Sequence, residues 1–157
     1  QMARGFSMEI LIAARPGSTA PIAKDRLSVS ELLQQADIVS LHCPLTPATK
    51  NLINDRSLAL MKPTAFLINT ARGALIDEAA LIDALRKKKI AAAALDVISK
   101  EPPAADHPII QAAAELDNLL VTPHTAWSTW EARQRLLVEV KSNIEAFLRG
   151  QPRNLVA

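Results

Sequence analysis

The chain has 157 residues and a formal net charge of +2 at pH 7, and 49% of its residues are hydrophobic while 3% are aromatic. This length is enough for one domain with a real core and too short for two domains of ordinary size. The net charge is too small for the basic footprint of a protein that binds nucleic acid or a membrane surface, so neither partner is expected. The basic run at 86–89 falls at the end of a predicted helix, where the helix dipole favours cations.

Cysteine usage and hydropathy bear on the cellular compartment. Cys43 is the single cysteine, which excludes an intramolecular disulfide, and it is interpreted as a buried thiol because no dedicated base lies near it in the sequence. No apolar run approaches the ~18 residues of a membrane span. The opening residues lack the pattern of a secretory signal. A reducing, cytoplasmic setting is therefore expected.

Taken in chain order, the first half alternates short apolar runs with helical patterns. Apolar runs that stop at turn residues predict strands at 8–14, 38–41 and 65–69. Helical patterns lie between them at 28–36, where Ser28 or Ser30 can act as the N-cap, and at 55–61. The intervening residues 16–27, rich in Pro, Ser and Thr, are predicted to be a connection.

The second half continues this alternation. Asp77 is the predicted N-cap of a helix over 78–88, whose apolar positions fall on one face. The run at 90–98 is ambiguous, because alanine favours helix whereas a short apolar run before Pro-Pro favours a buried strand; a strand is predicted. The pattern ends with a weak helix at 108–114, a strand at 118–123 and a long terminal helix at 128–149, which Gly150 stops.

The order of these elements predicts the fold class. Strands that alternate with helices and are apolar on both faces imply a mostly parallel sheet covered on both sides. The predicted class is a doubly wound, Rossmann-like α/β fold. In such a sheet, ligands bind beyond the carboxyl ends of the strands.

Three residues of complementary chemistry follow three different predicted strands: Arg72, Glu101 and His124. Arginine presents a planar fork that suits a carboxylate, and histidine can give and take a proton near neutral pH. A glutamate hydrogen-bonded to that histidine would fix its tautomer and keep it protonated. The trio therefore predicts a cleft that binds a carboxylate and reduces a neighbouring carbonyl.

Each of these residues also has a purely structural interpretation. Arg72 fits an exposed arginine beside a helix, His124 a hydrogen-bonded histidine after a proline, and Glu101 a solvated loop residue. His42, at another strand end, and His107, in a predicted surface loop, are given mainly structural roles. No single residue decides between the interpretations.

Four segments resemble one family when they are taken together. In order, they are LHCPLTPATKNLI, LMKPTAFLINTARGALIDEAAL, AALDVISKEPP and LLVTPHTAWSTWEAR. They are similar to the D-isomer-specific 2-hydroxyacid dehydrogenases, and TPHTAW followed by EARQRL particularly resembles the glycerate dehydrogenase or hydroxypyruvate reductase branch. The resemblance implies an NAD(P)-dependent oxidoreductase. Its substrates would be small 2-oxo and 2-hydroxy acids, such as hydroxypyruvate and D-glycerate or glyoxylate and glycolate.

The resemblance also implies roles for individual residues. Arg72, Glu101 and His124 would be catalytic, with Arg72 holding the 2-oxo acid and His124 delivering a proton to its carbonyl oxygen. Asp96 would hold the nicotinamide carboxamide. Further cofactor contacts would come from His42, Cys43, Pro44, Thr70, Ala71, His124 and Ala126.

One departure from the family's pattern concerns its glycines. The fingerprint G-x-G-x-x-G is absent, because glycine occurs only at positions 5, 17, 73 and 150. Residues 1–127 are therefore expected to be a nucleotide-binding domain without its first strand and glycine loop, with 128–157 a terminal helix and tail that return toward a substrate domain. The natural protein is expected to be longer. A non-catalytic, corepressor-like nucleotide-binding protein and an inactive fragment are the alternatives.

The other departure is Arg15, which follows the predicted strand at 8–14. NAD-specific relatives place an acid here for the ribose hydroxyls, whereas an arginine suits the 2′-phosphate of NADP. NADP is therefore weakly favoured over NAD, against the alternative of a solvated arginine in a Pro-Gly turn. A homodimer is expected, because family members usually pair through the cofactor domain.

Overall fold

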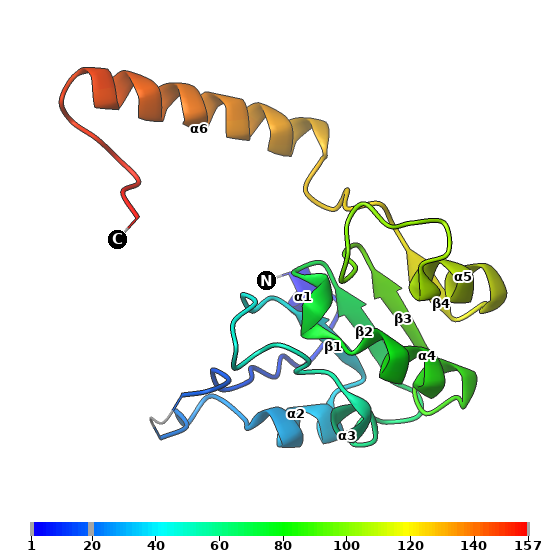
Figure 1. Ribbon diagram of the computed structural model, residues 1–157. Helices are drawn as coiled ribbons and strands as arrows, with labels where there is room; N and C mark the ends of the chain where they lie inside the picture. Colours follow the sequence, from blue (N-terminus) through cyan, green and yellow to red (C-terminus); the bar gives the residue numbers. More distant parts are fainter. Residues whose placement is uncertain (1, 19–20, 157) are drawn as a thin grey trace. The chain divides into compact units, whose positions relative to one another are not determined.

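The computed structural model describes residues 2–18 and 21–156 (Figure 1). The chain divides into two compact units, Gln1–Pro123 and His124–Ala157. The expected assignment of residues 1–127 to a nucleotide-binding domain stays a prediction.

The first unit is built on a four-stranded parallel sheet. Its strands, in spatial order, are β1 (Ile38–Leu41), β2 (Phe66–Asn69), β3 (Ala92–Leu95) and β4 (Leu119–Val121). The register aligns the last residues of the four strands in one row, which consists of Leu41, Asn69, Leu95 and Val121. The α/β class with a parallel sheet is confirmed, and the alanine-rich run at 90–98 does contain a strand.

Short helices precede or connect these strands, and four of them begin at a polar N-cap. The hydroxyl of Ser28 accepts from the backbone N–H of Glu31 and so caps α2 (Val29–Gln35). The caps Asn54, Asp77 and His107 precede α3 (Asp55–Leu58), α4 (Glu78–Arg86) and α5 (Pro108–Glu115). A 3-10 turn, η1 (Gly73–Leu75), follows β2, and α1 (Met2–Gly5) opens the described chain. The predicted helices are confirmed, although the one expected at 55–61 is a single turn.

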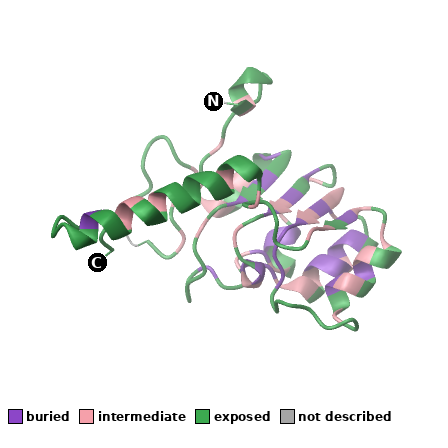
Figure 2. Ribbon diagram, turned by 90° about the horizontal axis from the view of Figure 1, so that it is seen from above, coloured by how far each residue is buried: buried purple, intermediate pink, exposed green. Residues whose placement is uncertain are grey.

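The hydrophobic core of this unit lies between the helices and one face of the sheet (Figure 2). Leu67 of β2 and Leu81 of α4 are both 0% exposed within it. On the opposite face, Ile38, Phe66 and Leu120 are 47%, 50% and 61% exposed. Because strand side chains alternate between the two faces of a sheet, these three side chains lie on the face opposite the core.

The prediction of a regular strand at 8–14 is wrong. Apart from one isolated bridge between Ala13 and Leu27, this run has no regular secondary structure. A strand requires neighbours that pair its backbone N–H and C=O groups, and the described residues supply only that bridge. Leu11 nevertheless packs against the core, while Met8 is 47% exposed.

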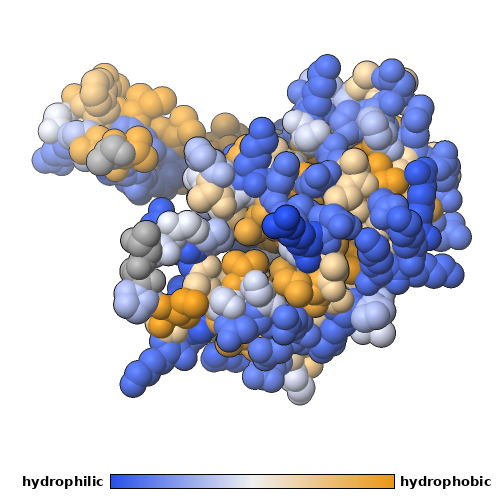
Figure 3. Space-filling model, turned by 60° about the horizontal axis from the view of Figure 1, so that its bottom comes forward, coloured by the Kyte–Doolittle hydropathy of each residue, from blue (hydrophilic) through white to orange (hydrophobic). Residues whose placement is uncertain are grey.

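The second unit is one long helix with a tail. The helix α6 (Trp130–Leu148) begins after the N-cap Thr129, as the pattern at 128–149 predicts. The Glu139 carboxylate accepts from Arg153 at 2.7 Å and from Asn154 at 2.5 Å, which holds the tail against the helix. Hydrophobic side chains are prominent on the surface of α6 (Figure 3). Among the helices of residues 2–18 and 21–156, none is long and apolar enough to cross a membrane.

Candidate active site at the carboxyl edge of the sheet

The parallel strands of the first unit end at one edge, and the residues that follow them share it. His42 directly follows β1, and Asp96 directly follows β3. Arg72 comes shortly after β2. Thr122 directly follows β4, and its backbone N–H donates to the carbonyl of Leu95 at 2.9 Å. The topology therefore gathers these positions where α/β sheets bind ligands.

The loop that carries Arg72 is held by a buried asparagine. Asn69, the last residue of β2, is 0% exposed. Its Oδ1 accepts from the backbone N–H of Ala71 at 3.0 Å, and its Nδ2 donates to the carbonyl of Arg72 at 2.9 Å. The Arg72 side chain is exposed, and its Nη1 donates to the Ala71 carbonyl at 2.6 Å. The guanidinium thus reaches solvent from a backbone that internal hydrogen bonds fix.

Gly73 brings this loop against the loop that follows β3. A Cβ atom at position 73 would overlap the carbonyl group of Ile98 and the backbone nitrogen of Ser99. The two loops therefore pack backbone against backbone. This contact joins the segment that carries Arg72 to the segment that carries Glu101.

Two carboxylates shape the loop after β3. Glu101 accepts from the backbone N–H of Ile98 at 3.0 Å. Glu78, in the first turn of α4, accepts from the backbone N–H of Ser99 at 2.6 Å and from its hydroxyl at 2.8 Å, and its Oε2 lies 3.7 Å from Nε2 of His107. Glu78 was not predicted from the sequence, because an acidic residue in the first turn of a helix is already explained by the helix dipole. His107 is a half-buried helix cap instead of the predicted surface-loop residue.

Asp96 is a buried carboxylate at the end of β3, with 6% of its surface exposed. The hydroxyl of Thr122 donates to its Oδ1 at 2.5 Å. A buried charge is costly unless hydrogen bonds compensate it, so this bond helps to hold the carboxylate in place. Asp96 therefore offers a fixed acceptor at the edge of the sheet.

The turn after β1 is organised by local contacts. Nε2 of His42 lies 2.9 Å from Oγ of Ser40. Cys43 is half-buried and packs against the core, and the carbonyl of Pro44 accepts from the hydroxyl of Thr49 at 2.7 Å. These contacts position the backbone of the turn at the same edge as Arg72.

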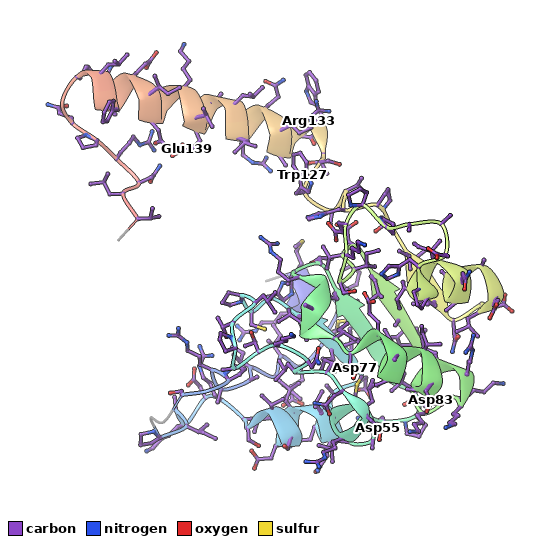
Figure 4. All side chains as sticks on the ribbon, in the orientation of Figure 1. Asp55, Asp77, Asp83, Trp127, Arg133 and Glu139 are labelled. Atoms are coloured by element: carbon purple, nitrogen blue, oxygen red, sulfur yellow. The ribbon has the colours of Figure 1, made fainter. Side chains whose placement is uncertain are left out.

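His124 is the first residue of the second unit and is exposed. Its φ of +55° lies in the left-handed region, which residues other than glycine seldom adopt. Its carbonyl accepts from Nε1 of Trp127 at 2.9 Å, which closes a turn before α6 (Figure 4). The exposed Ala126 belongs to the same turn.

Arg15 is exposed on a turn in the first unit. Its carbonyl accepts from the backbone N–H of Ser18 at 3.2 Å, and Gly17 has a φ of +76°. Nearby in the sequence, Nη1 of Arg26 donates to the carbonyl of Ala13 at 3.0 Å. Turn geometry and exposure leave the Arg15 guanidinium accessible to a ligand.

Within the basic run at 86–89, Arg86, Lys87 and Lys89 pair with carboxylates, which agrees with the interpretation of the run as a solvated helix end. Nζ of Lys89 lies 3.0 Å from Asp55 and 3.7 Å from Asp83, two residues labelled in Figure 4. The hydrogen bond to Asp55 raises the pKa of Lys89. A hydrogen bond from Lys87 holds the pKa of Asp83 below its ordinary value.

Comparison with known proteins decides the family. The profile of the NAD binding domain of D-isomer specific 2-hydroxyacid dehydrogenases matches residues 1–126. The chain belongs to this family. Among curated relatives, it is 48% identical over 130 residues to a glycerate dehydrogenase of Methylorubrum extorquens, covering 83% of this chain and 41% of the relative. It is 39% identical over 160 residues to a glyoxylate reductase of Aeropyrum pernix, covering 99% of this chain and 47% of the relative.

Solved structures of the same family have the same fold. An acyclic imino acid reductase in complex with NADPH and D-Arg superimposes with a TM-score of 0.84 at 35% identity, covering 99% of this chain and 48% of that one. The NAD-complexed dehydrogenase of Lactobacillus delbrueckii ssp. bulgaricus gives a TM-score of 0.77 at 31% identity, covering 89% and 47%. The chain thus spans about half the length of the relatives it matches.

Proposed function

We propose that the chain is the cofactor-binding part of an NAD(P)-dependent 2-hydroxyacid dehydrogenase that interconverts small 2-oxo and 2-hydroxy acids. The observation that carries the proposal is the contact at Gly73, which joins the loops of Arg72 and Glu101. That contact lies at the edge where Asp96 is buried. Hydroxypyruvate and glyoxylate are the proposed substrates, because similar chains are named glycerate dehydrogenase, hydroxypyruvate reductase and glyoxylate reductase.

In this proposal, three residues bind the substrate or assist its protonation. Arg72 grips the carboxylate with two parallel N–H···O bonds, which a guanidinium fork favours. His124 gives a proton to the carbonyl oxygen, so that the oxygen becomes a hydroxyl. Glu101 is the proposed partner of this histidine, because a carboxylate that accepted from the other ring nitrogen would fix the tautomer.

The residues at the strand ends fit the nicotinamide end of the cofactor, which supplies the hydride when bound. The fixed carboxylate of Asp96 suits the N–H donors of a carboxamide. The further residues proposed to line the nicotinamide and its ribose are His42, Cys43, Pro44, Thr70, Ala71, His124 and Ala126. A G-x-G-x-x-G cradle for the pyrophosphate does not occur in this sequence.

NADP is the proposed cofactor in preference to NAD. The guanidinium of Arg15 is exposed on a turn, where it can meet a 2′-phosphate. Among the structural relatives, one is a complex with NADPH and another is an NAD-complexed form. The active form is proposed to be a homodimer, and a monomer in sedimentation at micromolar concentration would contradict this.

The function is tested with protein made from the complete reading frame. Hydroxypyruvate and glyoxylate are assayed separately with NADPH and NADH by the loss of reduced-nicotinamide absorbance. Turnover of at least one acid is expected, and no turnover with any pair would contradict the proposal. Binding of the dinucleotide without turnover would favour the corepressor-like alternative.

Arg72→Lys tests the carboxylate anchor in the same assay. Lysine keeps the charge and loses the fork, so the KM for the 2-oxo acid should rise by about tenfold or more. Arg133→Lys, an exposed substitution of the same kind on α6 (Figure 4), is the control and should leave KM unchanged. A near-normal KM for Arg72→Lys would remove Arg72 from this role.

A further inference from the structure

We propose that Asn69 is the positioning residue that aims Arg72 at the substrate carboxylate. The proposal rests on the function proposed above, and it assigns a role to a side chain that does not itself reach the substrate. Its basis is the pair of hydrogen bonds that the Asn69 amide makes across the turn of Arg72.

Asn69 is a polar residue between apolar residues of the two neighbouring strands. It is the last residue of β2, it pairs with Leu41 on one side and with Leu95 on the other, and it is 0% exposed. An amide buried without hydrogen bonds would cost roughly 1–3 kcal/mol, so its partners define its orientation. The structure supplies them within the next three residues.

The two hydrogen bonds of the Asn69 side-chain amide restrain the backbone before and after the Cα atom of Arg72. Oδ1 accepts from the N–H of Ala71, in the peptide unit between Thr70 and Ala71, and Nδ2 donates to the carbonyl of Arg72 itself. The main chain of Asn69 is anchored as well, because its carbonyl accepts from the backbone N–H of Asp96 at 2.9 Å. The turn is therefore tied through one side chain to the central strands of the sheet.

The far side of the turn is blocked by a different contact. Gly73 lies directly against the backbone of Ile98, so the turn cannot relax in that direction. Between these two restraints, Arg72 has an extended backbone with φ −147° and ψ +137°. The direction of its Cα–Cβ bond is thus fixed, although the side chain beyond it is exposed.

A fixed direction matters because a two-pronged grip on a carboxylate depends on geometry. A misplacement of about 1 Å can cost on the order of a hundredfold in rate. Asn69→Asp tests the positioning of Arg72 without changing the packing of residue 69, because aspartate has nearly the same size as asparagine and still accepts from the N–H of Ala71. It cannot donate to the carbonyl of Arg72 when ionised, and it places two oxygens against each other there.

The same sheet offers a matched control. Nδ2 of Asn118 also donates to backbone carbonyls, at 3.3 Å to Leu85 and at 3.1 Å to Ala91, but it does so at the amino end of β4. Asn118→Asp therefore removes hydrogen bonds from a side-chain amide to backbone carbonyls at a place that is not the edge carrying Arg72. Both variants are made in the protein from the complete reading frame, and KM, kcat, the NADPH dissociation constant and the urea midpoint are measured.

Asn69→Asp is expected to raise the KM for the 2-oxo acid by about tenfold, with a dissociation constant for NADPH within about threefold of wild type. Asn118→Asp should lower the urea midpoint and leave KM unchanged. In an Arg72→Lys background, Asn69→Asp should add less than about a twofold further change, because residues that act through one another are not additive.

Equal KM values for Asn69→Asp and Asn118→Asp would overturn the proposal, and so would a full additional effect in the Arg72→Lys background. Asn69→Ser, which removes the amide without adding charge, is the second variant if Asn69→Asp does not fold; the same outcomes apply to it. A normal KM for Arg72→Lys would instead refute the anchor role in the proposed function. If Arg72→Lys raised the KM and Asn69→Asp did not, the positioning role of Asn69 would be refuted while the anchor role of Arg72 would stand.

Discussion

Gly73 and Ile98 touch through their backbones so closely that no side chain fits at position 73. The contact links the loops that follow two neighbouring strands, β2 and β3. Arg72 precedes this glycine, and Glu101 follows Ile98. The proposed carboxylate anchor and the proposed partner of His124 therefore lie on two loops that pack against each other at one edge of the sheet.

Gly73→Ala should damage both stability and activity. The added methyl group would overlap backbone atoms, which cannot swing away as a flexible side chain can, so a loss of about 1–3 kcal/mol or more in the free energy of unfolding is expected. The kcat/KM for the 2-oxo acid should fall at least tenfold, since Arg72 moves with the loop. Gly5→Ala is the control, because nothing lies within 4 Å of a Cβ atom there. Wild-type stability in urea for Gly73→Ala would contradict the close approach.

Glu78→Ala should loosen the loop of Glu101. Glu78 has 14% side-chain exposure and receives two hydrogen bonds from Ser99, so its removal should cost about 1.5–3 kcal/mol and lower kcat. Glu115→Ala is the comparison, because that carboxylate is 61% exposed and pairs with the exposed Arg86. Its loss should stay below about 1 kcal/mol. If urea titrations gave the same loss in the free energy of unfolding for both variants, the hydrogen bonds from Ser99 to Glu78 would contribute no extra stability.

His124→Ala should abolish turnover while leaving the cofactor affinity almost unchanged. Loss of a general acid typically costs about 10²–10⁴-fold in rate, so kcat should fall by that order. Ser128→Ala is the control for the turn itself, because it removes the hydrogen bond of 2.8 Å to the Thr125 carbonyl and keeps the imidazole. Its kcat should be near that of wild type. Retained turnover in His124→Ala would mean that another group supplies the proton.

Arg15→Asp should shift cofactor preference from NADPH toward NADH. A carboxylate repels a 2′-phosphate and can accept from ribose hydroxyls, so the ratio of kcat/KM for NADPH to that for NADH should fall by about tenfold or more. Lys24→Asp makes the same change of charge at an exposed position of the following connection and should leave the ratio unchanged. An unchanged ratio for Arg15→Asp would support the solvated-turn interpretation instead.

Much of the fold could be predicted from the sequence because its signals are local. Ser28 and Asp77 cap the helices they were expected to cap, and the alternation of apolar runs with helical patterns predicted the parallel sheet. The run at 8–14 shows the limit of such signals. Its residues carry the composition of a strand, but a strand forms only where a neighbour pairs with it, and neighbours are a property of the tertiary structure.

The candidate site divides in the same way. The sequence by itself determined which chemical groups follow the strands, including Arg72 and Asp96, because strand ends and residue types can be read along the chain. Only the tertiary structure decided that Asn69 turns its amide onto the loop of Arg72, that Gly73 admits the backbone of Ile98, and that Glu78 reaches Ser99 from another helix. The physical reason is that the local signals arise from neighbouring residues, whereas burial and close approach depend on which distant segments the folded sheet brings together.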